Sequence, residues 1–140
     1  MSLADQYFTQ PGSGRAPTAA GRFVDLANDV EPVAFVPGLE FRHLLGESTM
    51  LMSVRFGPHT EAPVHAHDEE QITLVIEGEL EFEIDGEVRQ LSPGMVAVVP
   101  ANVPHGARTK DHSCLEYDVF NPPRKALLDL ADAARKQAAG

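Results

Sequence analysis

Three histidines and a glutamine limit the folds open to this 140-residue chain more than any other feature. His65 and His67 are one residue apart, Gln71 follows, and His105 comes 40 residues after His65. Side chains alternate between the two faces of a β-strand, so His65 and His67 point the same way if a strand carries them. A third imidazole from another strand can then close on them. The pattern favours strands gathered around a site for a metal ion.

The rest of the chain reads mainly as short strands separated by Gly, Pro and Asp-Gly signals, with Asp85-Gly86 the strongest sign of a two-residue hairpin. Many short strands at regular spacing predict a β-sandwich or barrel. The candidate strands are 22–26, 33–36, 39–45, 48–56, 62–67, 71–76, 79–84, 87–91, 95–99, 105–109 and 113–120.

The expected pairing of the strands in the middle of the chain predicts which of their faces lies inside the barrel and which lies outside. We expect 71–76 to pair with 79–84 across Glu77-Gly78, which puts Gln71 on an apolar face and so in the barrel interior. The opposite face carries an apolar stripe that a second sheet, the N-terminal arm or a partner subunit could cover. We therefore expect a homodimer. The stripe is formed by Ile72, Leu74 and Ile76.

The length fits one β domain with two extensions. Residues 1–21 contain Pro and Gly without periodicity and are expected to form a flexible N-terminal arm. Residues 22–121 form the predicted β domain. Residues 122–140 form a helical tail, in which 124–139 is the one predicted helix, beginning after Pro122-Pro123.

The composition of the chain argues against some classes of binding partner. A net charge of −10 without any basic cluster argues against nucleic acid. No apolar stretch reaches the roughly 18–20 residues that span a bilayer, so no membrane partner is expected. The absence of a signal-like start, and Cys114 as the single cysteine, favour the cytoplasm. The expected partner is a small-molecule substrate, oxygenated or anionic.

The ligand set predicts one divalent metal ion per chain, held by His65, His67, His105 and Gln71. All four are neutral, so the ion would keep its full charge, act as a stronger Lewis acid and prefer anionic substrates. A slip of one residue would instead make Glu70 the oxygen ligand. Such ligands admit zinc, nickel, manganese, iron or copper, and we favour zinc. The other histidines are expected to have ordinary roles, although His59 could be a further ligand if its strand bends.

The residues around these ligands resemble the two signature motifs of the cupin superfamily. The first runs through Gly57, His65, His67, Gln71 and Gly78, and the second from Pro93-Gly94 to Pro104-His105. The resemblance covers roughly residues 45–120. It implies a small antiparallel jelly roll with the metal inside its open end, so the predicted fold is an all-β cupin jelly roll with one C-terminal helix.

This sequence departs from the commonest cupin pattern in four places. Seven residues rather than five separate Gly57 from His65, and Gln71 stands where Glu is usual. Asn102 replaces a usual Gly, and Thr109 replaces a frequent Asn. We expect the last two to alter only a turn, whereas Gln71 alters the charge of the metal site.

The run from His65 to Gln71 looks like that of small cupins from pectin and alginate degradation, which convert unsaturated uronates to linear ketonised sugars. The string from Asp118 to Arg124 also resembles theirs, and in that family its Asp, Phe and Arg line the site. Asp118 could move a proton, Phe120 could wall the pocket and Arg124 could clamp a carboxylate. In build, the chain also resembles the small zinc cupins that cyclise aromatic polyketides.

These features predict a metal-dependent isomerase or cyclase in which the cation acts as a Lewis acid on an enolisable carbonyl. An unsaturated uronate-type sugar acid is the best family match, and aromatic polyketide cyclisation is the alternative. A metal-dependent dioxygenase and a non-catalytic small-molecule-binding cupin remain open as well, because a fold alone does not fix function.

Overall fold

The computed structural model describes residues 2–8, 12 and 14–139. The parts of the predicted arm at residues 1, 9–11 and 13, and of the predicted tail at residue 140, lie outside the described residues.

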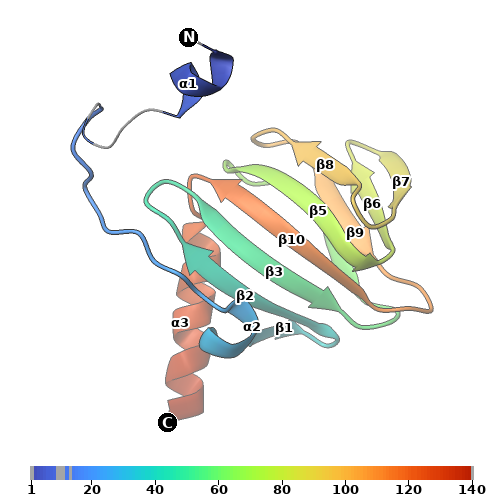
Figure 1. Cartoon of the computed structure of the whole chain (residues 1–140). Helices are drawn as coiled ribbons and strands as arrows, with labels where there is room; N and C mark the ends of the chain where they lie inside the picture. The colour runs from blue at the N-terminus through green and yellow to red at the C-terminus, as the bar shows by residue number, and fades with distance from the viewer. Residues whose placement is uncertain (1, 9–11, 13, 140) are drawn as a thin grey trace.

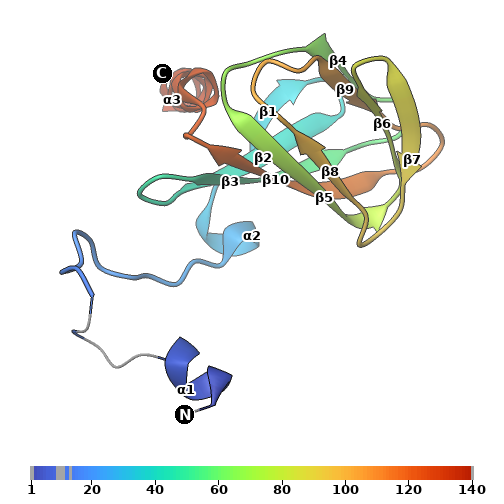
Figure 2. The same ribbon diagram turned by 90° about the horizontal axis from the view of Figure 1, so that it is seen from above.

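Within the described chain, ten strands form two antiparallel sheets that face each other (Figures 1 and 2). The predicted all-β jelly roll with a C-terminal helix is confirmed. The six-stranded sheet has the order β1 (Val33–Val36), β2 (Leu39–Leu45), β3 (Met50–Phe56), β10 (Cys114–Asn121), β5 (Glu70–Gly78), β8 (Val96–Val99). The four-stranded sheet has the order β4 (Glu61–His65), β9 (His105–Arg108), β6 (Leu80–Ile84), β7 (Glu87–Leu91).

The C-terminal helix, α3 (Lys125–Ala139), agrees with the predicted 124–139 and buries Leu127 and Ala131 against the sheets. Two short helices were not predicted, α1 (Leu3–Tyr7) and α2 (Leu26–Asp29). The strand expected over 22–26 is wrong, because the Asp25 carboxylate accepts the Asn28 N–H and starts α2 there. No helix in the described part of the chain has the length and apolar character needed to cross a membrane.

The faces of the central strands that were predicted to lie inside and outside agree with the observed burial. The predicted pairing of these strands is wrong. Gln71 is buried on β5 and Phe82 on β6, whereas Ile72 is exposed. These two strands do not pair, because β5 lies between β10 and β8 and β6 lies between β9 and β7. The chain passes from one sheet to the other at Gly78, whose φ is 76°. A Cβ there would lie 2.2 Å from the Ser113 carbonyl oxygen, so glycine makes the crossing possible.

The hairpin predicted at Asp85-Gly86 is confirmed. It joins β6 to β7, with Ile84 opposite Glu87. Asp85 and Gly86 have φ values of 49° and 86°, as the favoured two-residue hairpin turn requires.

The outer face of the six-stranded sheet carries a row of apolar side chains. In the strand register Val98 lies opposite Ile72, Ile72 opposite Val119, and Val119 opposite Leu51. Val98 is 57%, Ile72 40% and Val119 39% exposed. This apolar row, Val98–Ile72–Val119–Leu51, is where the homodimer would form, and the homodimer stays a prediction.

We expect Ile72→Glu to convert the dimer to a monomer, because it puts a charge in the middle of the apolar row. Sedimentation velocity would measure the change. Val88→Glu is the matched control, since Val88 is 47% exposed on β7 of the other sheet. A monomeric wild-type protein, or equal dissociation by Val88→Glu, would contradict the prediction.

Candidate metal centre

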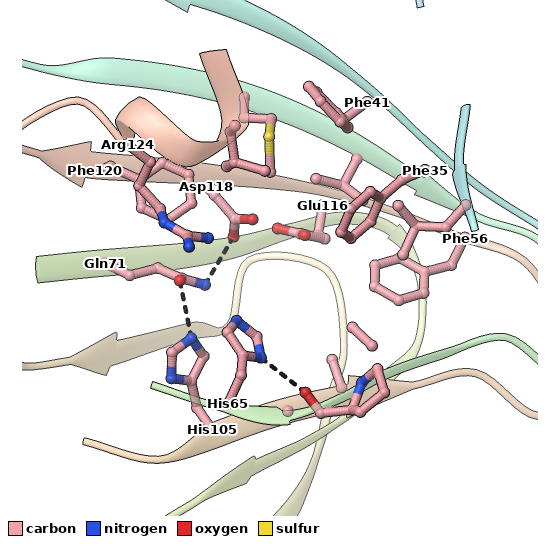
Figure 3. Close-up of a pocket in the computed structure, with 18 of the residues that line it drawn as sticks. Phe35, Phe41, Phe56, His65, Gln71, His105, Glu116, Asp118, Phe120 and Arg124 are labelled. Carbon is pink, nitrogen blue, oxygen red and sulfur yellow. Dashed lines mark hydrogen bonds between the residues drawn. The ribbon is translucent and has the colours of Figure 1, made fainter. Parts of the chain in front are cut away.

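Three imidazoles and one amide oxygen come together between the two sheets. The nearest ring nitrogens of His65, His67 and His105 all lie within 4.8 Å of one another. The Oε1 atom of Gln71 is 3.1 Å from Nε2 of His67 and 3.1 Å from Nε2 of His105. Figure 3 shows Gln71 descending from one sheet toward His65 and His105 on the other.

Strand pairing and a bulge bring the histidines together. His65 at the end of β4 lies directly opposite His105 at the start of β9. The register shifts between Ala62 and His65, where β4 has one residue more than β9, and this bulge turns His65 to the same face as Ala62. Pro63 fits the bulge because it has no N–H to give to the neighbouring strand.

His67 lies beyond the strand that was expected to carry it. The strand predicted over 62–67 ends at His65, so the alternation of a regular strand does not place His67. Instead, the His67 carbonyl accepts the N–H of Asn102 at 2.8 Å, which ties the segment to the loop before β9. Asn102 has a φ of 65°, a conformation that Asn tolerates better than most residues, so it serves where a Gly is usual.

Each histidine ring is held by a hydrogen bond to a backbone carbonyl. Nδ1 of His65 lies 2.7 Å from the Pro63 oxygen, Nδ1 of His67 lies 2.9 Å from the Glu69 oxygen, and Nδ1 of His105 lies 2.9 Å from the Val103 oxygen. A carbonyl can only accept, so Nδ1 carries the hydrogen in all three rings. Each neutral ring therefore has its free lone pair on Nε2, the arrangement of metal-ligating histidines.

The Gln71 amide is oriented by its nitrogen. Nε2 donates to Thr73 Oγ1 at 2.8 Å and to Asp118 Oδ1 at 3.3 Å. These acceptors turn Oε1 toward the histidines. Gln71 is 6% exposed, whereas its neighbour Glu70 is exposed on the other face of β5, so the oxygen at the centre belongs to Gln71.

The residues fit a cation because acceptors face one another with no hydrogen between them. Nε2 of His67 and of His105 each approaches an amide oxygen that can only accept. Burial lowers the pKa of His67, and lowers that of His105 to about 4, so neither ring is protonated at neutral pH. A divalent ion among these lone pairs would turn the unfavourable approach into coordination.

Asp118 lies directly behind Gln71. It is 5% exposed and its Oδ1 accepts from Thr73 Oγ1 at 2.7 Å as well as from Gln71. Burial raises the pKa of Asp118, although the hydrogen bonds from Glu116 and Thr73 oppose the shift. A carboxylate that binds a proton more readily than usual, beside the centre, is suited to moving a proton.

Arg124 and Phe120 close the same end of the pocket. Arg124 lines the pocket while its Nε donates to Glu69 Oε1 at 3.2 Å, and its guanidinium carbon lies 5.7 Å from the centre of the Phe120 ring. The Phe120 ring is buried and meets that of His67 edge-on at 5.8 Å. Arg124 thus remains near the centre, with Glu69 balancing part of its charge.

Beyond the centre the pocket is walled mainly by carbon. Its volume is about 460 Å³. Phe82 and Met52 line it, together with aromatic and aliphatic side chains of the six-stranded sheet and of α3. These are Phe35, Leu39, Phe41, Val54, Phe56, Leu127 and Leu130. Such a wall suits a ring or hydrocarbon portion of a ligand.

Sequence reasoning missed two carboxylates. Glu116 is 4% exposed and shares a pocket-facing side of β10 with Asp118, which period-two alternation could have shown. Glu69 pairs with Arg124 across 55 positions of sequence, and no local signal predicts this contact.

The remaining histidines stay outside the centre. His59 is surface exposed and pairs with Asp111 at 3.2 Å. It does not belong to the cluster that could hold a metal ion, nor do His43 and His112.

Comparison with known proteins supports this fold. Residues 52–118 match the model of a family described as the cupin domain. An H2HPP isomerase of Bacillus subtilis is 34% identical over 82 residues, which cover 57% of this chain but only 34% of that protein. This chain thus spans about a third of the relative's length.

Two solved structures have similar folds. KdgF from Halomonas sp. is 28% identical with a TM-score of 0.70, over 78% of this chain and 99% of that one. The polyketide cyclase RemF from Streptomyces resistomycificus is 22% identical with a TM-score of 0.66, over 76% of this chain and 82% of that one, a likeness of fold alone.

We expect His67→Ala and His105→Ala each to reduce bound zinc from about one equivalent per chain to nearly none, because each removes one of three nitrogen ligands. Elemental analysis after dialysis against a weak chelator would measure it. His112→Ala, on the surface, should keep its zinc. Full metal content in the His67 and His105 variants would refute the site.

We expect Gln71→Glu to destabilise the metal-free protein by about 1–3 kcal/mol, because it places a second carboxylate where Asp118 now accepts a hydrogen bond. Added zinc should restore much of this loss. Thermal unfolding with and without zinc measures both effects. Gln90→Glu is the matched control, since Gln90 donates to Glu79 at 3.0 Å on the exposed surface. Equal losses in both variants would contradict the argument.

Proposed function

We propose that this protein, whose residues 52–118 match the cupin domain family, is a metal-dependent isomerase or cyclase that acts on an enolisable carbonyl compound at the centre described above. The observation that supports this most is the meeting of three imidazoles and an amide oxygen at one end of a carbon-walled pocket, with the buried Asp118 behind them. A bound divalent ion, for which we favour zinc, would polarise the carbonyl and stabilise negative charge on its oxygen.

His65, His67, His105 and Gln71 would hold the ion. All four ligands are neutral, so its charge would be fully available to the substrate oxygen. The carbonyl hydrogen bonds to the rings and the bonds from Gln71 to Thr73 and Asp118 hold these atoms in place before substrate arrives. Preorganisation of this kind lowers the cost of reorganisation during the reaction.

Asp118 would act as the proton carrier. In the proposed reaction its carboxylate takes a proton from the carbon next to the carbonyl and returns it to a different carbon, so there is no net oxidation. Its raised pKa brings it nearer to neutral pH, where a group can both accept and release a proton. Arg124 would bind an oxygenated or anionic group beside the carbonyl through its planar guanidinium.

The wall of the pocket favours a substrate with a ring or hydrocarbon body. Phe35, Phe41 and Phe56 lie at the end away from the histidines (Figure 3), where a sugar would find few partners for its hydroxyl groups. An isomerisation or cyclisation of a cyclic or aromatic ketone is therefore the reaction that we put first.

Arg124 favours a second candidate, the ring opening of an unsaturated uronate. The positively charged guanidinium of Arg124, beside the centre, would suit a sugar carboxylate. The string from Asp118 to Arg124 also resembles that of the uronate cupins. Two results together would favour this candidate over the first. The protein would turn over an unsaturated uronate, and Arg124→Gln would lower that turnover at least about tenfold.

Deuterium exchange at the carbon next to the carbonyl of phenylacetone tests the first candidate. We expect the zinc-loaded protein to accelerate the exchange in D₂O, and Asp118→Asn to slow it by roughly 100-fold or more while keeping its zinc. Proton NMR follows the exchange, and elemental analysis follows the metal. Asp111→Asn, on the surface, is the control. Equal exchange by Asp118→Asn and wild type would remove Asp118 from the reaction.

A further inference from the structure

Glu69 links the metal centre to Arg124. Of the three consecutive acidic residues 68–70, only Glu69 is not exposed at the surface. Its Oε1 accepts from Nε of Arg124 at 3.2 Å, and the two side chains are 20% and 17% exposed. The same Oε1 lies 3.6 Å from Nδ1 of His67, whose ring donates to the Glu69 backbone carbonyl. One carboxylate thus fixes the position of Arg124 relative to a histidine of the centre.

Three contacts hold Arg124 in place. Its backbone carbonyl accepts the N–H groups of Leu127 and Leu128, at 3.1 and 3.2 Å, in the first turn of α3. Its guanidinium carbon lies 5.7 Å from the centre of the Phe120 ring. Of these three contacts, only the one with Glu69 takes up a hydrogen of the guanidinium. Glu69 therefore decides which edge of that group stays free.

The free edge of the guanidinium belongs to the pocket. Arg124 lines the pocket, and Figure 3 shows the end of its side chain pointing toward Asp118 and Gln71. Among the described residues no atom accepts from Nη1 or Nη2 of Arg124, and neither nitrogen is fully buried. A guanidinium that gives Nε to one carboxylate keeps two parallel N–H donors on its Nη1–Nη2 edge. These donors match the two oxygens of a second carboxylate.

Stability alone does not account for the pair of Glu69 and Arg124. A partly exposed ion pair contributes little to the free energy of folding. The long side chain of an arginine loses much rotational freedom when a ligand orders it, and a contact that orders it beforehand removes this cost from binding. The pair therefore contributes more to the binding of a ligand than to folding.

We propose that Glu69 is a positioning residue, which holds Nε of Arg124 so that the Nη1–Nη2 edge binds a carboxylate of the substrate. The substrate is accordingly a ring compound that carries a carboxylate near the carbonyl group placed at the histidine centre. The carbonyl group rests on the proposed function, whereas the role of Glu69 rests on its hydrogen bond to Arg124. Glu69 acts through Arg124 and does not itself touch the ligand.

Glu69 has two effects of opposite sign on an anionic ligand, so substitutions can separate them. Its negative charge weakens the binding of an anion, whereas its hydrogen bond to Nε orders Arg124 and strengthens that binding. Glu69→Gln removes the charge and keeps an oxygen that accepts from Nε. Glu69→Ala removes the charge and the acceptor. The two variants therefore differ in the group that orders Arg124.

A pair of ketones measures the binding of the carboxylate to the zinc-loaded protein. 3-Benzoylpropionate has a ring, an enolisable ketone and a carboxylate, and butyrophenone has a methyl group in place of the carboxylate. We expect calorimetric titration to show that the wild type binds 3-benzoylpropionate at least about tenfold more tightly than butyrophenone, because only the carboxylate pairs with Arg124. Arg124→Gln should remove this preference.

We expect Glu69→Gln to bind 3-benzoylpropionate at least as tightly as the wild type and about fivefold more tightly than Glu69→Ala, in which the ligand itself must order Arg124. Butyrophenone should bind equally to all three proteins. Glu87→Ala is the matched control and should leave the binding of both ketones unchanged, since Glu87 accepts from Nε of Arg89 at 2.7 Å on the exposed surface. Equal binding of 3-benzoylpropionate by the two Glu69 variants would overturn the role of Glu69.

Far-ultraviolet circular dichroism and elemental analysis check that the Glu69 variants are folded and keep their zinc. If Glu69→Ala does not fold, Glu69→Gln still decides. This variant keeps the acceptor, so retention of the wild-type preference would support the proposal and its loss would overturn it. A wild type without the preference, including one that binds neither ketone, would overturn the proposal as well.

Deuterium exchange next to the carbonyl group of the same ketones separates this proposal from the proposed function. The expected difference between the Glu69 variants without any exchange would support the role of Glu69 and refute the carbonyl chemistry. Exchange on both ketones, with equal binding by the two variants, would refute the role of Glu69 and leave the carbonyl chemistry standing.

Discussion

The centre depends on hydrogen bonds that fix where lone pairs point. Backbone carbonyls take the Nδ1 hydrogens of three histidines, and Thr73 and Asp118 take the hydrogens of the Gln71 amide. What remains are Nε2 and Oε1 atoms that can only accept and that nevertheless lie together in a partly buried site. The proposal of a cation follows from this arrangement more than from the presence of histidines.

Strand β10 connects the two chemically different ends of the pocket. Its alternate residues Phe120, Asp118 and Glu116 pass from the histidine centre to the carbon-walled end, while the residues between them face outward toward the apolar row. One strand therefore places both carboxyl groups on the wall of the pocket. A strand in the middle of a sheet holds such a placement better than a loop.

Much of this arrangement could be predicted from local patterns. The spacing of His65, His67, Gln71 and His105 indicated which side chains would meet, and alternation placed Gln71 inside. The pairing of 71–76 with 79–84 was wrong because Glu77-Gly78 resembles a hairpin turn, while the contact with Ser113 that directs the chain into the other sheet is distant in sequence. The pair of Glu69 and Arg124 was missed for the same reason, whereas the place of Glu116 follows from the alternation of side chains along β10, two residues before Asp118.

Gln71 explains how a neutral ligand set could still hold a metal ion. An amide oxygen is a weaker donor than a carboxylate, but this amide donates through its nitrogen toward the buried Asp118 carboxyl group. When Asp118 is ionised, that hydrogen bond polarises the amide and makes Oε1 more negative, as carboxylates behind ligating histidines do. A Glu in the same place would lie against Asp118 and repel it. The amide thus lets one buried carboxylate strengthen the centre and remain available for proton transfer.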